Sequence, residues 1–128
     1  MRTEELFKEP PFIKLYLDDL SRLNGLTSVQ RTVLNIVMKY ASYGNELVVT
    51  KKTRDIILKE GNIALGSFKN ALSVLVQKEL LYKGNKRSIY VINPLLAFKG
   101  RIGDRAKLII TYNELGEREA IKLEGEIK

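Results

Sequence analysis

Short hydrogen-bonding side chains follow one face of a helix that the sequence predicts over residues 65–78. The apolar residues of this segment, among them Phe68 and Leu72, recur at helical spacing and predict a buried face. The opposite face has no acidic residue. It presents Ser67, Lys69, Asn70 and Ser73, together with the small residue Gly66 near the helix start. In the major groove Asn suits adenine, Lys suits guanine and Ser suits either base. We therefore expect these five residues to read DNA, with Gly66 and Ser67 small enough to let a phosphate approach.

Basic residues gather in the middle of the chain. Residues 50–90 carry nine Lys or Arg and three Asp or Glu, whereas residues 1–49 carry six of each and residues 91–128 carry seven and six. Six of the seven net positive charges therefore lie in this middle part. Two groups stand out, one at the start of an expected helix and one on an expected hairpin: Lys51, Lys52 and Arg54, and Lys83, Lys86 and Arg87. We expect both groups to contact phosphates without regard to base sequence.

The composition argues against most catalytic and metal chemistry. The chain has no cysteine and no histidine, which excludes disulfides, thiolate metal sites and the common nucleophile arrangements. Asp18 and Asp19 diverge by about 100° on a helix and make a poor acid/base pair. The glycines at 61 and 66 are not followed by the Gly-Lys-Ser or Gly-Lys-Thr of a nucleotide-binding loop. We therefore expect no enzyme, no catalytic residue, no metal and no cofactor.

The expected elements occur in the order of a winged helix-turn-helix. Two helices joined by a short Gly-containing turn precede a two-stranded hairpin, and in that fold the second helix enters the major groove. The sequence predicts helices over residues 12–23, 27–42, 51–59 and 65–78 and strands over residues 47–49, 80–83, 88–92 and 107–112. Thr27 and Gln30 form a predicted capping box, and Thr50 is a predicted N-cap. The expected fold class is mainly α with a small β-sheet.

The length of 128 residues suits one core. We expect a winged-helix domain over residues 1–112 and a charged, flexible tail over residues 113–128. No secretory signal or long apolar run is visible, so a cytoplasmic location and no membrane contact are expected. Phe12 and Leu15 lie off the apolar stripe of the first expected helix. They indicate a second buried face, covered either by another subunit or by the C-terminal strand.

Four segments of the chain resemble the RepL-type plasmid replication proteins of Gram-positive bacteria. They are Phe12-Ile-Lys-Leu-Tyr-Leu-Asp-Asp-Leu, residues 63–78, Tyr90-Val-Ile-Asn-Pro and residues 106–112. The resemblance covers residues 12–112 and implies a winged-helix initiator that binds origin DNA and recruits host replication proteins. One departure is Ala64, where the family commonly has Ser or Thr. Because Ala cannot cap through its side chain, this departure would shift the helix start and the residues that reach DNA.

The residues themselves leave two alternatives to an initiator. A transcriptional or copy-number repressor with the same fold would bind a promoter instead of an origin. A protein-interaction module in a replication or segregation complex would bind DNA weakly and without sequence preference. A homodimer on an inverted repeat is compatible with each DNA-binding role, because two reading helices about 34 Å apart match adjacent half-sites.

Overall fold

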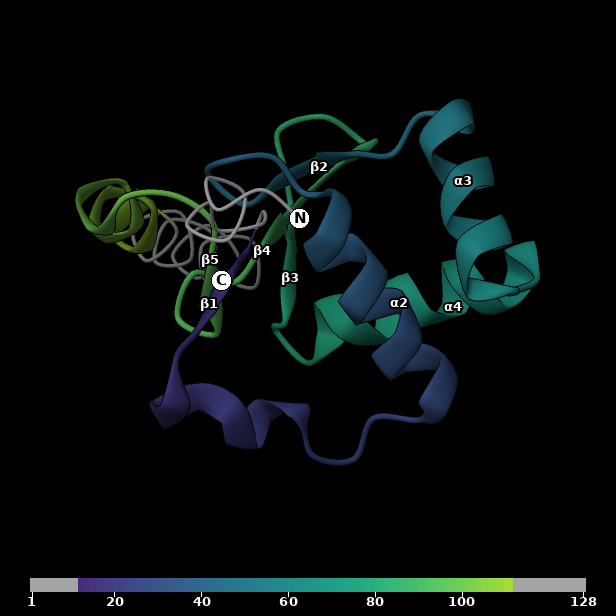
Figure 1. The fold of residues 1–128 in the computed structure, drawn as a ribbon, viewed down its shortest axis with the longest axis horizontal. Helices are drawn as coiled ribbons and strands as arrows, with labels where there is room; N and C mark the ends of the chain where they lie inside the picture. Colours follow the sequence, from purple (N-terminus) through teal and green to yellow (C-terminus); the bar gives the residue numbers. More distant parts are fainter. Residues whose placement is uncertain (1–11, 112–128) are drawn as a thin grey trace, which may run out of the picture.

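The computed structural model describes residues 12–111, which form a mainly helical fold with two small antiparallel sheets (Figure 1). The elements are β1 (Lys14–Leu15), the 3-10 helix η1 (Leu17–Leu23), α2 (Ser28–Tyr40), β2 (Glu46–Val48), α3 (Lys51–Gly61), α4 (Leu65–Gln77), β3 (Leu81–Lys83), β4 (Ile89–Ile92), β5 (Ala97–Phe98) and a helix over residues 102–111. The expected order of helix, strand, two helices and hairpin is confirmed from α2 to β4. The predicted tail at 113–128 lies outside the described residues.

Helices α2 and α4 pack against each other and build most of the core. Helix α2 begins where predicted, because Thr27 and Gln30 form both hydrogen bonds of the capping box. The fully buried large side chains come from α2, α3, α4, both sheets and the segments next to the strands: Val33, Leu34, Val37, Ile57, Phe68, Leu75, Leu80, Leu81, Ile92, Leu96 and Phe98. Each such side chain contributes about 1.5–3 kcal/mol relative to exposure to water. The core therefore fixes α4 with its polar face turned outward.

The three-stranded sheet has the order β2-β4-β3, and β4 pairs antiparallel with both neighbours. The hairpin between β3 and β4 closes where the Gly84 amide donates to the Ile89 carbonyl at 2.8 Å. A Cβ at Gly84 would overlap the Ile89 side chain. The hairpin therefore needs glycine here, and it places Lys86 and Arg87 in the connecting turn.

Asn45 joins the two sheets at a fully buried position. Its side-chain amide donates to the carbonyls of Ile92 at 2.9 Å and Ala97 at 2.7 Å, and its oxygen accepts from the Lys99 amide at 2.8 Å. The Lys99 ammonium donates to three carbonyls at the end of α2, including that of Ala41 at 2.7 Å. Burial lowers the pKa of Lys99. The C-terminal part is thus tied to the end of α2 by polar contacts.

Two predicted elements are wrong. The first expected helix is replaced by β1 and η1, because Lys14 and Leu15 pair with Phe98 and Ala97 of β5 and this pairing overrides the helical spacing. The predicted strand over 107–112 is helical as far as it is described, from 102 to 111. Periodicity alone cannot assign so short an apolar run to a strand or to a helix. Arg105 fixes this helix, donating to the Pro94 carbonyl at 2.8 Å.

The second buried face predicted for Phe12 and Leu15 is not covered by a strand. Their side chains are 54% and 45% exposed, because residues 102–111 form a helix at the far end of the molecule from α3 (Figure 1). Burial under a C-terminal strand is therefore wrong, and contact with another subunit stays a prediction. No helix within residues 12–111 is long and apolar enough to cross a membrane.

Candidate nucleic-acid interface

Helix α4 divides into the two faces that the sequence predicts. Phe68, Ala71, Leu72 and Leu75 are buried. The five predicted reading residues are all exposed: Gly66, Ser67, Lys69, Asn70 and Ser73. Ala64 is the N-cap and gives no side-chain hydrogen bond, yet the helix still begins at Leu65. The predicted faces are therefore in place without a side-chain cap.

Asn62 makes the turn that sets α4 at an angle to α3. Its backbone is left-handed, with φ at 51°, and its amide donates to the carbonyls of Leu58 and Lys59 as α3 ends. Asparagine tolerates this conformation better than most residues. A Cβ at Gly61 would meet the side chains of Ile63 and Ile36, so the turn also packs closely on α2. The sequence Gly61-Asn62 thus produces a short connection between α3 and α4.

Five cations from four chain segments surround one hollow of ≈ 440 Å³. They are Lys51 and Arg54 of α3, Lys69 of α4, Lys83 of β3 and Arg87 of the hairpin turn. Phe68, Leu72 and Tyr90 contribute apolar wall, and Thr50 and Ser88 contribute hydroxyls. No acidic residue of the described chain lines this hollow, which we call the basic hollow.

The cations of the basic hollow have no carboxylate partners within residues 12–111. The ion pairs found there join Arg22 to Asp19 and Glu79, and Lys39 to Glu60. The Nε of Arg54 is buried and has no hydrogen-bond acceptor among the described residues. A buried donor without an acceptor costs about 1–3 kcal/mol. The basic hollow therefore holds positive charge that nothing in the described protein neutralises.

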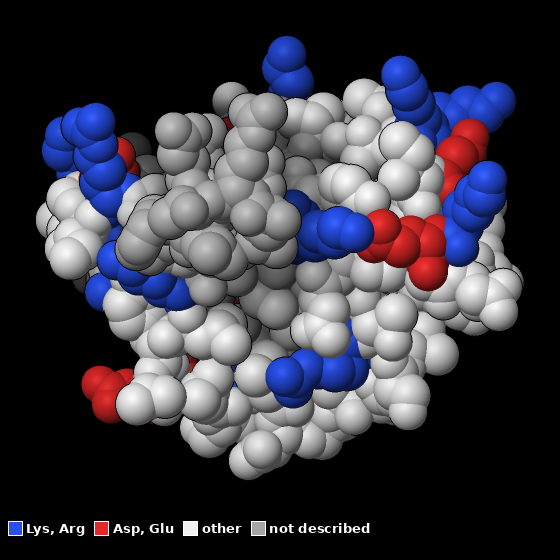
Figure 2. Space-filling view, viewed as in Figure 1, with Lys and Arg blue, Asp and Glu red and all other residues white. Residues whose placement is uncertain are grey.

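The face seen in Figure 2 differs, because acidic side chains lie among the basic ones over α3. Glu60 of α3 accepts from the Lys39 ammonium and from the Tyr40 hydroxyl, both at 2.8 Å. The bond from Lys39 lowers the pKa of Glu60, and the same bond raises the pKa of Lys39. The charge of Lys39 is thus balanced by Glu60.

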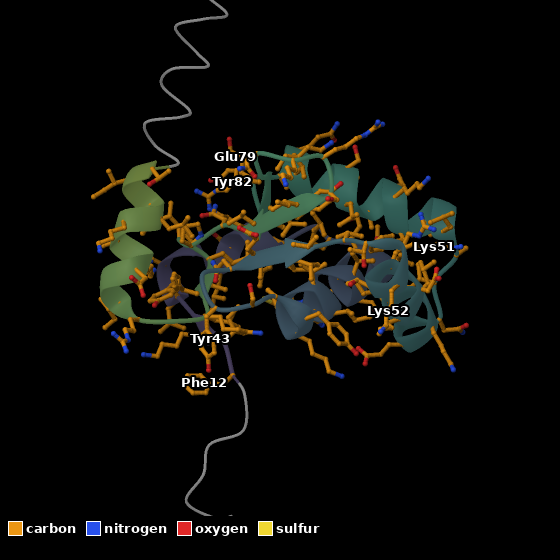
Figure 3. All side chains as sticks on the ribbon, turned by 90° about the horizontal axis from the view of Figure 1, so that it is seen from above. Phe12, Tyr43, Lys51, Lys52, Glu79 and Tyr82 are labelled. Carbon is orange, nitrogen blue, oxygen red and sulfur yellow. The ribbon has the colours of Figure 1, made fainter. Side chains whose placement is uncertain are left out.

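Some predicted residues lie outside the basic hollow. Lys52 lines a shallow depression with Asp55, Ile56 and Lys59, and Figure 3 shows Lys51 and Lys52 at the same end of the molecule. Ser67 lines a smaller hollow of ≈ 200 Å³ beside Ser28 and Thr32 of α2. Lys86 is exposed in the hairpin turn, and Gly66, Asn70 and Ser73 are exposed on α4.

Three wall residues that carry a hydroxyl group were missed by the sequence analysis: Thr50, Ser88 and Tyr90. Thr50 was recognised only as the N-cap of α3, where its hydroxyl accepts from the Thr53 amide at 3.2 Å. Tyr90 lies opposite Lys83 in the hairpin register. Because paired residues share one face of a sheet, this pairing was the signal that would have placed Tyr90 beside a predicted cation.

Comparison with known proteins gives one family match. The family described as Firmicute plasmid replication protein (RepL) matches residues 3–128. No curated protein and no solved structure gives a significant match. Within residues 12–111, no cluster of three acidic, histidine or cysteine residues is suited to hold a metal ion.

Proposed function

The chain belongs to the RepL family of Firmicute plasmid replication proteins, and from this premise we propose that it initiates replication by binding duplex DNA at a plasmid origin. In this proposal it is a cytoplasmic winged-helix protein that performs no catalysis itself. The basic hollow carries the proposal, because five unpaired cations there converge beside the exposed face of α4.

In this proposal the charged and the uncharged side chains have different roles. Lys51, Arg54, Lys83 and Arg87 line the hollow and hold phosphate oxygens, which sets the register of the protein on DNA. A phosphate in the hollow would also give the guanidinium of Arg54 the acceptor that it lacks. Ser67, Asn70 and Ser73 are uncharged, so their contribution is hydrogen bonding to base edges.

Lys69 is placed to serve both roles, because it lies on α4 and also lines the basic hollow. The exposed start of α4 adds backbone N–H groups that Ala64 does not cap and that favour an anion. Lys86 extends the basic surface to the hairpin tip and Lys52 extends it along α3. The proposed footprint is therefore continuous from α3 across α4 to the hairpin.

Selection of bound duplexes from a random pool tests the proposal. The full chain is used at about 0.15 M salt, where contacts between exposed charges separated by more than a Debye length of about 8 Å are largely screened. We expect one enriched motif that occurs in a plasmid origin, and an inverted repeat would indicate two copies on adjacent half-sites.

The other outcomes of this selection contradict the proposal in different ways. A motif found in a promoter and absent from the origin would indicate a repressor. Binding without any enrichment would assign the exposed face of α4 to a protein partner within a replication complex, such as a host replication protein. A Lys14→Ala variant serves as the control and should select the same motif. Lys14 is an exposed cation on β1 that lies outside the proposed footprint.

A further inference from the structure

Phe12 separates two hollows on the side of the molecule away from α4. The first, of ≈ 440 Å³, is lined by Phe12, Tyr43, Phe98, Lys14, Arg101 and Asp104. The second, of ≈ 480 Å³, lies between Phe12 and the end of α2, where Met38 and Lys99 line it. In Figure 3 Phe12 and Tyr43 lie together at one edge of the molecule, and α4 lies toward the opposite edge. We call the two hollows together the Phe12 groove.

The Phe12 groove is apolar and yet exposed to solvent. The side chain of Tyr43 is 81% exposed and that of Phe12 is 54% exposed. Two large aromatic side chains brought together from separate chain segments expose a continuous apolar surface, which is typical of a surface that contacts another segment or molecule. DNA held by α4 and the hairpin would leave this side uncovered.

The charges of the groove specify what it can hold. Lys14, Lys99 and Arg101 have no carboxylate partner within the described residues, and Asp104 is the one acid among the residues that line the groove. Lys39 also lines the groove, so the net charge of its four cations and one acid is +3. A matching occupant carries apolar side chains between acidic ones, with an excess of negative charge.

Residues 112–128 have this composition. They contain five glutamates and three basic residues: Glu114, Glu117, Glu119, Glu124 and Glu126, and Arg118, Lys122 and Lys128. Apolar residues are interspersed: Leu115, Ile121, Leu123 and Ile127. The net charge of −2 is opposite to that of the groove residues. The match to the RepL family also extends through this segment, to residue 128.

The connection to the rest of the chain allows this segment to reach the groove. Arg101 and Asp104 line the groove at the start of the helix over residues 102–111, which rises about 15 Å over ten residues. Seventeen extended residues span up to about 55 Å, so residues 112–128 can return along the helix. Tethering on the same chain also gives an effective concentration on the order of millimolar.

We propose that residues 112–128 dock in the Phe12 groove of the same chain, with their leucine and isoleucine side chains against Phe12 and Tyr43. The glutamates lie beside Lys14 and Arg101. This docking is independent of DNA binding, because it uses the side of the molecule away from α4. It gives the glutamate-rich segment a structural role.

Limited digestion of the full chain with trypsin tests the docking at Arg118 and Lys122. We expect Tyr43→Ser to speed cleavage at these two sites about tenfold, because cleavage follows the population of the undocked segment. Leu17→Ser is the matched control, since Leu17 is also 81% exposed but does not line the groove. Higher salt should speed cleavage of the unaltered chain, because it screens the charge attraction.

Three results would overturn the proposal. Equal cleavage rates in the unaltered chain and in Tyr43→Ser would mean that the segment does not occupy the groove. Protection that grows with protein concentration would assign the groove to a second copy. Protection of Lys8 in place of Arg118 and Lys122 would assign it to residues 1–11. Unchanged DNA affinity in Tyr43→Ser separates all of these results from a failure of the proposed function.

Discussion

Asn70 is the residue whose substitution best separates base reading from phosphate binding. It is exposed on α4, uncharged and outside the basic hollow. We expect Asn70→Ala to remove preference at one base pair, at a cost of about 1–3 kcal/mol on the preferred site and little on other sequences. Titration of the selected duplex and of its single-base-pair variants measures this, with Gln77→Ala at the other end of α4 as the control. An equal loss on every duplex would rule out a reading role for Asn70.

Asn45 illustrates what the sequence could not reveal about single residues. The pair Gly44-Asn45 predicts only a turn. The helical period of α4 correctly separates its buried residues from its exposed ones. Both of these signals are local in the sequence. Asn45 bonds to Ile92, Ala97 and Lys99, which are distant in the sequence. No local pattern encodes such partners. The same limit hid Thr50, which became part of the basic hollow only through the packing of α3.

Asn45→Ala should be among the most destabilising single changes in this protein. It would leave two buried carbonyls and one amide without partners and would place alanine at a φ of 70°. We expect a loss of about 3 kcal/mol in the free energy of unfolding, measured by urea denaturation. Asn35→Ala, at an exposed position in α2, is the control and should change stability by less than about 0.7 kcal/mol. Similar values for both variants would contradict the role assigned to Asn45.

At the scale of elements, replacing either of two glycines by alanine should change the stability of the protein, in opposite directions. Gly84→Ala would force a Cβ into the Ile89 side chain and distort the hairpin, which costs about 1–3 kcal/mol. Gly66→Ala has open space around its Cβ within a helix and should stabilise by about 0.5–1 kcal/mol. Thermal unfolding distinguishes the two signs. Both variants should bind DNA more weakly, Gly84→Ala by moving the hairpin and Gly66→Ala by crowding the start of α4.

The elements that the sequence predicts well are those with their own start and stop signals. Thr27 caps α2, Thr50 caps α3 and Asn62 ends α3, as their positions indicate. The two wrong elements lie at either end of the described chain, where β1 pairs with β5 across most of the sequence. When two strands are this far apart in the sequence, no local sequence pattern predicts that they pair. The run at residues 107–112 was short enough to fit a strand or a helix.

At the scale of the whole molecule, the five cations of the basic hollow lie on the side that carries α4 and the hairpin, and this predicts how DNA binding depends on salt. If the five cations of the basic hollow each neutralise one phosphate, the slope of log K against log salt is about −4.5. Removing one of them with Arg87→Ala should reduce the slope by about 0.9, and the double variant with Lys83→Ala by about 1.8.

Fluorescence anisotropy titrations at several salt concentrations from about 0.05 to about 0.3 M measure these slopes. Lys14→Ala removes an equal charge from the opposite side and should leave the slope unchanged, although the net charge of the molecule falls equally. Equal slopes for Lys14→Ala and Arg87→Ala would mean that total charge governs binding. A smaller slope for Arg87→Ala alone would mean that the side carrying α4 and the hairpin is the one that meets DNA.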